Sequence, residues 1–308
     1  MRYICVQPAI MYYTWQVEVM INNFKKQGIN PNHIDIVCGI QNGVIPHEWS
    51  VLANHYNTVR FFFYNDTRQS KNYISSIRPN ILKQHFNKHP YLSQEVVFYH
   101  DCDILFTKPV NFSKLESDDT VYGSDTISYI GHNYILSKGE DVLDKMCEIV
   151  NIDKQLIKDN ELNSIGAQYI LKNIDHKFWE KVEDDSERLF KEITDLNNIK
   201  KAETPEYHEL QIWCADMWAV LWNIWKLGKK TACHTDLEFA WSTSHIDEWN
   251  KLNIFHNAGV TDSTSGYFYK SDYTSRVPYT DTLEIKANTA SYQYWKEIQE
   301  TAKHTVLL

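Results

Sequence analysis

The sequence lacks several sequence motifs that would directly indicate an enzyme class. It contains neither Gly-x-Gly-x-x-Gly nor Gly-x-x-x-x-Gly-Lys, so a dinucleotide-binding Rossmann fingerprint and a P-loop are both unsupported. No two of its six cysteines have Cys-x-x-Cys spacing, which argues against a zinc site. The cysteines are scattered, mostly inside apolar segments, and we expect reduced, buried thiols in a reducing compartment: Cys5, Cys38, Cys102, Cys147, Cys214 and Cys233.

The sequence also lacks an excess of positive charge and a long hydrophobic run. Its formal net charge of −9 argues against tight general binding of nucleic acid. The longest apolar stretch, 211–227, contains Asp216, Asn223 and Lys226 and is too short and polar for a confident membrane span. The N-terminus enters a strand-like segment without a signal-peptide pattern. We therefore expect a soluble protein of the cytoplasm, or of the host cytoplasm if viral, without stable membrane insertion.

What is present is an ordinary globular composition, 43% hydrophobic and 23% charged, in which short apolar segments alternate with helical periodicity. This alternation predicts βαβ units, a mostly parallel central sheet flanked by helices, and C-terminal elaborations in a single domain over 1–308. We expect two functional halves, at 1–110 and 111–308. The expected strands are 3–6, 33–40, 59–64, 95–99, 121–124, 130–136 and 252–255, and the expected helices are 12–26, 80–87, 139–149, 163–173 and 211–227. The polar stretch 181–209 is expected to be an exposed helix.

A carboxylate pair, Asp101 and Asp103, ends the apolar strand segment at 96–100. In an extended chain these side chains point to one face, while Cys102 points to the other. Two such carboxylates repel each other unless a cation lies between them, and oxygen ligands suit Mn²⁺ or Mg²⁺ bound together with substrate phosphates. This pattern is typical of Asp-x-Asp glycosyltransferases, in which the metal bridges a sugar-nucleotide diphosphate. The alternative is a turn that uses Asp for its turn propensity.

Other candidates lie at the ends of predicted strands, where ligands of parallel sheets bind. Gln7, Pro8 and Ala9 follow the first strand, and we expect them to contact the nucleotide. His256 follows a short strand and precedes a loop with Gly259, so its imidazole is the expected third metal ligand. An ordinary polar histidine is the alternative.

Asp216 lies in the apolar helix segment 212–218 and needs a partner to offset its desolvation. We expect it to bind an acceptor hydroxyl or to act on the reacting sugar, unless it is the structural partner of a buried cation. Arg78, at the head of a helix, would stabilise the leaving diphosphate, whereas Lys83 is expected to be a surface residue. Asp125 and Gln168 follow small residues and are expected to hold sugar hydroxyls, Gln168 in a catalytic role, unless they serve as cap or turn residues.

Three segments together resemble the hydroxyproline arabinosyltransferases and peptidyl-serine galactosyltransferases. The run 101–109, DCDILFTKP, is similar to their Asp-x-Asp stretch, 213–218 resembles their Trp-x-x-Glu-Met-Tyr helix with Asp216 in place of Glu, and 254–256 resembles their late His segment. The resemblance implies a GT-A fold, a UDP-sugar donor, Mn²⁺ on Asp101, Asp103 and His256, an active-site carboxylate at Asp216, and retention of anomeric configuration. Family members carry membrane anchors and this sequence shows none, so the acceptor is not carried over.

The sequence thus predicts a metal-dependent glycosyltransferase that moves a sugar from a nucleotide-sugar donor to a hydroxyl of a DNA base, a protein or a glycan. In this prediction, 1–110 is the nucleotide-binding half and 111–308 is the sugar- and acceptor-binding half. Two alternatives remain open at this point. One is a metal-dependent nucleotidyl or phosphoryl transferase, and the other is a non-catalytic glycan-binding module on a transferase fold.

Overall fold

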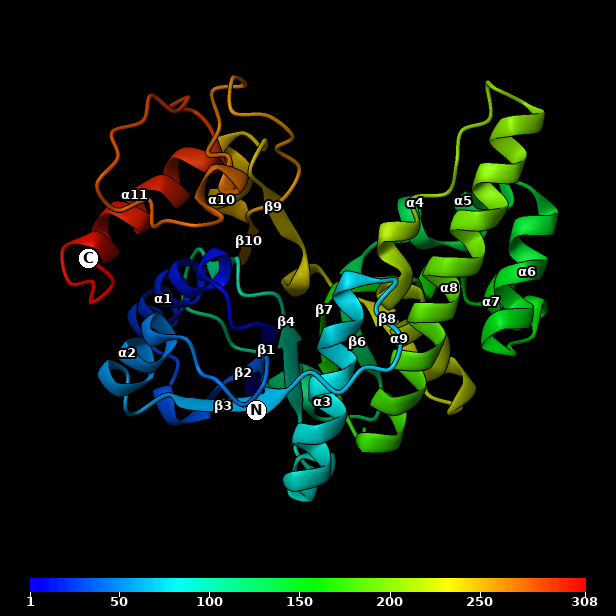
Figure 1. Cartoon of the computed structure of the whole chain (residues 1–308), viewed down its shortest axis with the longest axis horizontal. Coiled ribbons are helices and arrows are strands. Elements are labelled where there is room, and N and C mark those ends of the chain that lie inside the picture. Colours follow the sequence, from blue (N-terminus) through cyan, green and yellow to red (C-terminus); the bar gives the residue numbers. More distant parts are fainter. The chain divides into compact units, whose positions relative to one another are not determined.

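The centre of the protein is an α/β arrangement in a computed structural model that describes residues 1–308 (Figure 1). One sheet has seven strands in the order β3-β2-β1-β4-β7-β6-β8, and a second has three in the order β5-β10-β9. This confirms the expected fold class. The chain divides into two compact units, one of 1–65, 98–114 and 235–308 and the other of 66–97 and 115–234, and each is described by itself. The functional halves at 1–110 and 111–308 stay a prediction.

The first unit begins with three parallel strands, paired β1 with β2 and β2 with β3. β2 is buried at every position, as expected of an inner strand of a parallel sheet. Its one charged residue, Asp35, is fully buried and accepts bonds of 2.6 and 2.5 Å from the Arg60 guanidinium, which compensates the carboxylate. The elements are β1 (Arg2–Pro8), α1 (Met11–Lys26), β2 (Ile34–Ile40), α2 (His47–His55) and β3 (Arg60–Asn65).

The later segments of this unit begin with β4 (Val97–His100), a strand of the seven-stranded sheet. The small sheet and its helices follow: β5 (Ile104–Phe106), β9 (Phe239–Trp241), α10 (Ile246–Lys251), β10 (Ile254–His256) and α11 (Ala290–Ala302). An aromatic core joins this C-terminal part to α1, with Trp15, Phe255, Phe268 and Tyr294 all fully buried. Asn23 of α1 bonds both backbone groups of Phe106, at 3.1 and 2.9 Å, and so fixes β5 against the helix.

The second unit places helices around β6 (Val121–Asp125), β7 (Ile165–Leu171) and β8 (Thr231–Cys233). Its helices are α3 (Ile77–Lys88), α4 (Ile127–Ile130), α5 (His132–Leu136), α6 (Glu140–Val150), α7 (Lys154–Asp159), α8 (His176–Glu203) and α9 (Ala215–Lys226). The Asp175 side chain caps α8 by accepting from two backbone N–H groups at 3.0 Å. The long α8 lies along α3 and α9 (Figure 1).

Two predicted elements in this unit are wrong. The segment predicted as a helix at 163–173 is strand β7, because a short run that is apolar on all sides does not distinguish a buried strand from a helix. The segment predicted as a strand at 130–136 ends α4 and forms α5. There the Glu161 carboxylate accepts from the backbone N–H groups of His132 and Asn133, a long-range cap that the local pattern does not show.

The expected helix at 181–209 exists as most of α8, but it is not simply an exposed insertion. Val182, Leu189 and Ile193 are fully buried. Few apolar residues are enough here because they recur on one face of the helix.

The six cysteines form no disulfide in the structure, and five of them are buried, as expected. None of the helices combines the length and the apolar character that crossing a bilayer requires. The cytoplasmic location stays a prediction.

The core of the first unit yields a test. Phe255, the central residue of β10, is fully buried. Its ring stacks on that of Tyr294, with 5.1 Å between the ring centroids. We expect Phe255→Ala to lower the free energy of unfolding by about 3–5 kcal/mol, because it removes a large core side chain and leaves a cavity. Urea denaturation followed by fluorescence measures this change. The matched control is Leu162→Ala, at a position 77% exposed, which should leave the midpoint nearly unchanged.

Candidate functional site

The carboxylate pair lies in a turn between two strands. β4 ends at His100, Asp101 to Asp103 form the turn, and β5 begins at Ile104. The extended conformation predicted for this segment is wrong, because Cys102 and Asp103 lie in a turn. The two carboxylates nevertheless come together, with one oxygen of each within 4.8 Å of the other, while Cys102 between them is buried.

His256 reaches this turn through strand pairing. β10 runs antiparallel to β5 with His256 opposite Ile104, so its ring lies beside the preceding residue, Asp103. The His256 Nε2 atom is 3.3 Å from Asp103 Oδ1 and 3.6 Å from Asp101 Oδ2. The backbone N–H of Asn257 donates to the Asp103 carbonyl at 3.0 Å and locks the two segments together. The predicted trio is therefore one cluster.

The structure adds a residue that sequence reasoning missed. The Lys270 ammonium group, at the start of the short helix η8 (Lys270–Tyr273), forms an ion pair with Asp103 Oδ2. No motif surrounds this lysine, and it lies far along the chain from the aspartates. The only hint was the need for positive charge beside two carboxylates.

Burial and charge act in opposite directions on this cluster. Burial alone would raise the pKa of the Asp103 carboxyl, but Lys270 and His256 outweigh it and hold the pKa well below its usual range. Burial works to lower the pKa of the Lys270 ammonium group, and Asp103 more than compensates, so that pKa is raised. Asp103 is therefore a carboxylate throughout the neutral range.

The residues fit a divalent cation. One oxygen each from Asp101 and Asp103 and one imidazole nitrogen all lie within 4.8 Å of one another. His256 directs Nε2 toward the carboxylates, while its Nδ1 is buried without a hydrogen-bond partner. Carboxylate oxygens suit Mg²⁺ and Mn²⁺, and an imidazole in the set favours the transition metal.

The other candidates of the first unit lie at the end of β1. Gln7 is 2% exposed, and its amide donates to the Cys38 sulfur at 3.3 Å while its Oε1 atom has no partner. Pro8 is the last residue of the strand, and the Ala9 N–H donates to the Gly39 carbonyl at 2.7 Å. These contacts order the end of β1, and nucleotide binding there stays a prediction.

The second unit groups Asp216 with Arg78. The Arg78 Nη2 atom lies 3.1 Å from Asp216 Oδ2, and the Tyr73 hydroxyl lies 2.6 Å from Asp216 Oδ1. Burial and the nearby Asp216 charge raise the pKa of the Tyr73 hydroxyl well above its usual value, so it stays a neutral hydrogen-bond donor. The structural partner considered for Asp216 is therefore real, and Tyr73 is a contact that the sequence did not indicate.

The segment carrying Tyr73 is fixed by a buried carboxylate of α8. Glu187, 6% exposed, accepts from the Ser76 hydroxyl at 2.5 Å and from the Ser70 hydroxyl and the Asn72 N–H, each at 3.0 Å. These bonds hold an otherwise irregular stretch, so Tyr73 and Arg78 have fixed positions. Lys83, on the same helix as Arg78, pairs with Glu183 at 2.6 Å.

The remaining two candidates lie at the β6–β7 pair. Gln168 of β7 is fully buried and its amide donates to the Ser124 hydroxyl at 2.5 Å. Asp125 is exposed at the end of β6 and accepts from the backbone N–H of Ile127 at 2.9 Å, which starts α4. The turn role considered for Asp125 is thus present, and binding of sugar hydroxyls by either residue stays a prediction.

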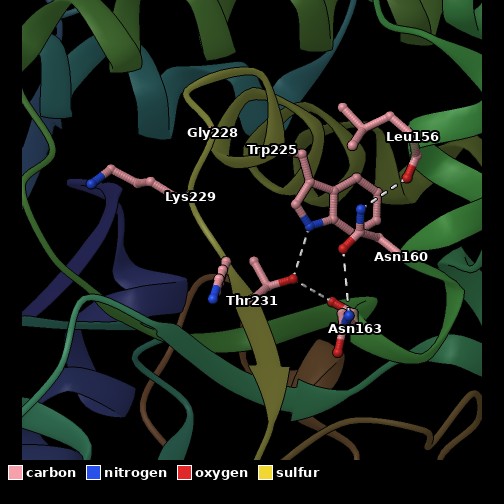
Figure 2. A pocket seen from close by; sticks show the side chains of 8 residues that line it. Leu156, Asn160, Asn163, Trp225, Gly228, Lys229 and Thr231 are labelled. Carbon is pink, nitrogen blue, oxygen red and sulfur yellow. Dashed lines mark hydrogen bonds between the residues drawn. The ribbon is translucent and has the colours of Figure 1, made fainter.

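A surface cavity of about 390 Å³ lies elsewhere in the second unit and includes none of these candidates (Figure 2). Figure 2 shows that several of its polar groups bond to one another. The Trp225 indole donates to the Thr231 hydroxyl at 2.8 Å, which donates to the Asn163 carbonyl at 2.7 Å. The residues that line the cavity include no carboxylate, histidine or cysteine that could hold a metal, so the carboxylate cluster is the stronger candidate.

Comparison with known proteins bears on the fold. No protein-family model and no curated protein matches the sequence. Among solved structures, the apo structure of the bifunctional glycosyltransferase WbbM matches with a TM-score of 0.52 and 10% identity over 99% of this chain and 50% of that one. The chain has the α/β fold of a GT-A glycosyltransferase. It spans about half the length of WbbM.

Two weaker likenesses carry no argument by themselves. Mouse xyloside xylosyltransferase 1, in apo form, matches with a TM-score of 0.40 and 6% identity over 83% of this chain and 97% of that one. The mannosyltransferase PcManGT from Pyrobaculum calidifontis, in complex with GDP-Man and Mn²⁺, matches with a TM-score of 0.29 and 11% identity over 74% of this chain and 71% of that one. The arabinosyl- and galactosyltransferase resemblance stays a prediction.

The Lys270–Asp103 ion pair predicts a competition between the lysine and a metal. We expect Lys270→Met to tighten Mn²⁺ binding by about tenfold in the absence of nucleotide, because one Asp103 oxygen is freed and a nearby positive charge is removed. Titration of free Mn²⁺ by electron paramagnetic resonance measures the affinity. Lys296→Met on α11 is the matched control, and equal or weaker binding by Lys270→Met would contradict the competition.

Proposed function

We propose that the protein is a metal-dependent glycosyltransferase that moves a sugar from a nucleotide-sugar donor, a UDP-sugar, to an acceptor hydroxyl with retention of anomeric configuration. The observation that carries this proposal is the cluster of Asp101, Asp103 and His256. The proposal is supported by the fold that carries this cluster, which the chain shares with a known glycosyltransferase. The acceptor class is a DNA base, a protein or a glycan.

We assign each residue of the cluster a role in binding the donor diphosphate. Asp101, Asp103 and His256 would hold Mn²⁺, or Mg²⁺ in its place, and a metal bound there would supply Lewis-acid stabilisation of the diphosphate leaving group. Lys270 places a second positive charge beside Asp103. A preorganised cation is most effective where negative charge grows, so we assign Lys270 to the departing phosphate.

The other predicted residues fill the remaining roles. Gln7, Pro8 and Ala9 bind the nucleotide, and the unpartnered Gln7 Oε1 supports a ligand contact at this point. Gln168 and Asp125 orient the sugar. We assign Arg78, in the second unit, the role of stabilising the negative charge on the donor phosphates.

Asp216 is the proposed carboxylate for the acceptor or the reacting centre. Its Arg78 and Tyr73 contacts fix both carboxylate oxygens in position. A carboxylate held in this way keeps one geometry without rearrangement during the reaction.

The metal assignment is tested by Asp103→Ala. We expect turnover of the donor to fall by more than about 100-fold, because the variant loses a metal ligand and the group that orders Lys270. A thermal-shift panel with UDP and UDP-sugars, with and without Mn²⁺, should show a metal-dependent rise of the melting temperature in the native protein and none in the variant. Glu148→Ala, at a side chain 73% exposed, is the control for a lost carboxylate. Near-normal transfer by Asp103→Ala would falsify the assignment.

A separate change tests the role of Asp216. Asp216→Asn keeps the size of the side chain but removes its charge, and we expect transfer to the acceptor to fall by about 100-fold or more. Donor binding in the thermal-shift assay should stay, since the carboxylate is assigned to the acceptor. Tyr73→Phe removes only one neighbouring hydroxyl and should cost less. Transfer by Asp216→Asn within threefold of the native rate would leave Asp216 a structural partner of Arg78.

A further inference from the structure

One tryptophan of the second unit is exposed in an unusual place. Trp218 and Trp222, on the same helical segment, are fully buried, whereas Trp213 is 59% exposed. An exposed indole keeps a large apolar face in water, which costs free energy unless something covers it.

The position of Trp213 is fixed by the groups around the Asp216 carboxylate. The helix η6 (Ile212–Cys214) leads directly into α9, so Trp213 and Asp216 are three residues apart in a helical segment and lie on the same side of it. The Tyr73 hydroxyl lies 2.6 Å from the Trp213 carbonyl and also 2.6 Å from Asp216. Tyr73 is itself 2% exposed and stacks on Phe190 at 4.8 Å. The backbone that carries the indole is therefore held in a fixed position.

A flat apolar face beside a fixed carboxylate has the chemistry that a sugar ring needs. The ring offers a face of C–H groups, which packs on an aromatic surface, and an edge of hydroxyls, which donate to a carboxylate. We propose that Trp213 is the platform on which a sugar ring of the acceptor stacks, so that the acceptor is a carbohydrate. This inference rests on the proposed glycosyltransferase function.

The local charges favour a neutral sugar over a nucleic acid. A base also stacks on an indole, but a nucleic-acid strand brings phosphates that need unpaired cations. Here the neighbouring cation, Arg78, is already assigned to the donor phosphates, and the chain has a net charge of −9.

The test compares Trp213→Ala with Trp213→Phe. The probes are methyl glycosides of glucose, galactose, xylose and mannose, a serine- and hydroxyproline-containing peptide, and an oligodeoxynucleotide with 5-hydroxymethylcytosine. Binding is read by saturation-transfer NMR without donor, and transfer is read by mass spectrometry with the UDP-sugar selected in the thermal-shift panel. Ile199→Ala, at a position 55% exposed on α8, is the control for loss of exposed apolar surface.

We expect at least one glycoside to bind and accept sugar, with Trp213→Ala raising its KM roughly tenfold or more and Trp213→Phe raising it no more than about threefold. The increase should fall on the acceptor KM and not on the KM for the donor. Transfer only to the peptide or the oligonucleotide, or an acceptor KM within twofold of native in Trp213→Ala, overturns the inference. If no nucleotide binds but Trp213-dependent glycoside binding persists, the proposed function fails and the sugar site stands.

Discussion

The constraint on which the candidate site depends is the repulsion between two carboxylates held on one tight turn. Asp103 is 5% exposed, so water screens it poorly, and its charge needs a partner within the protein. The Lys270 ammonium group contacts one oxygen of Asp103, and the His256 imidazole contacts the other. The carboxylate charge that Lys270 stabilises is therefore the one that would attract a divalent cation, so the lysine and the metal act on a single charge.

Strand register brings these groups together. β10 pairs with β5, and a shift by one residue would turn His256 to the other face of the small sheet. The aromatic core behind the sheet makes such a shift costly, because Phe255 would lose its buried place. Packing energy in the core thus specifies the geometry of a polar site at the strand ends.

Local pattern was enough for much of the fold and for the members of the cluster. Strands with strong apolar runs, such as β2, and helices with clear periodicity, such as α1, were predicted within a few residues. The errors at α5 and β7 have one cause. Short apolar runs are ambiguous, and the deciding contacts, such as the Glu161 cap on α5, come from distant residues. Lys270 and Tyr73 were missed for the same reason, because each acquires its role only through a tertiary contact.

Asp216 shows why a structural and a functional interpretation need not exclude each other. The alternative to a reactive role for Asp216 was a structural ion pair with a buried cation, and Arg78 is that cation. A carboxylate that accepts from both Arg78 and Tyr73 loses conformational freedom during folding, before any substrate binds. The order that a structural partner imposes is thus the preorganisation that a reacting group requires. The Tyr73 hydroxyl also contacts the Trp213 carbonyl, so the same tyrosine fixes the backbone that carries the exposed indole.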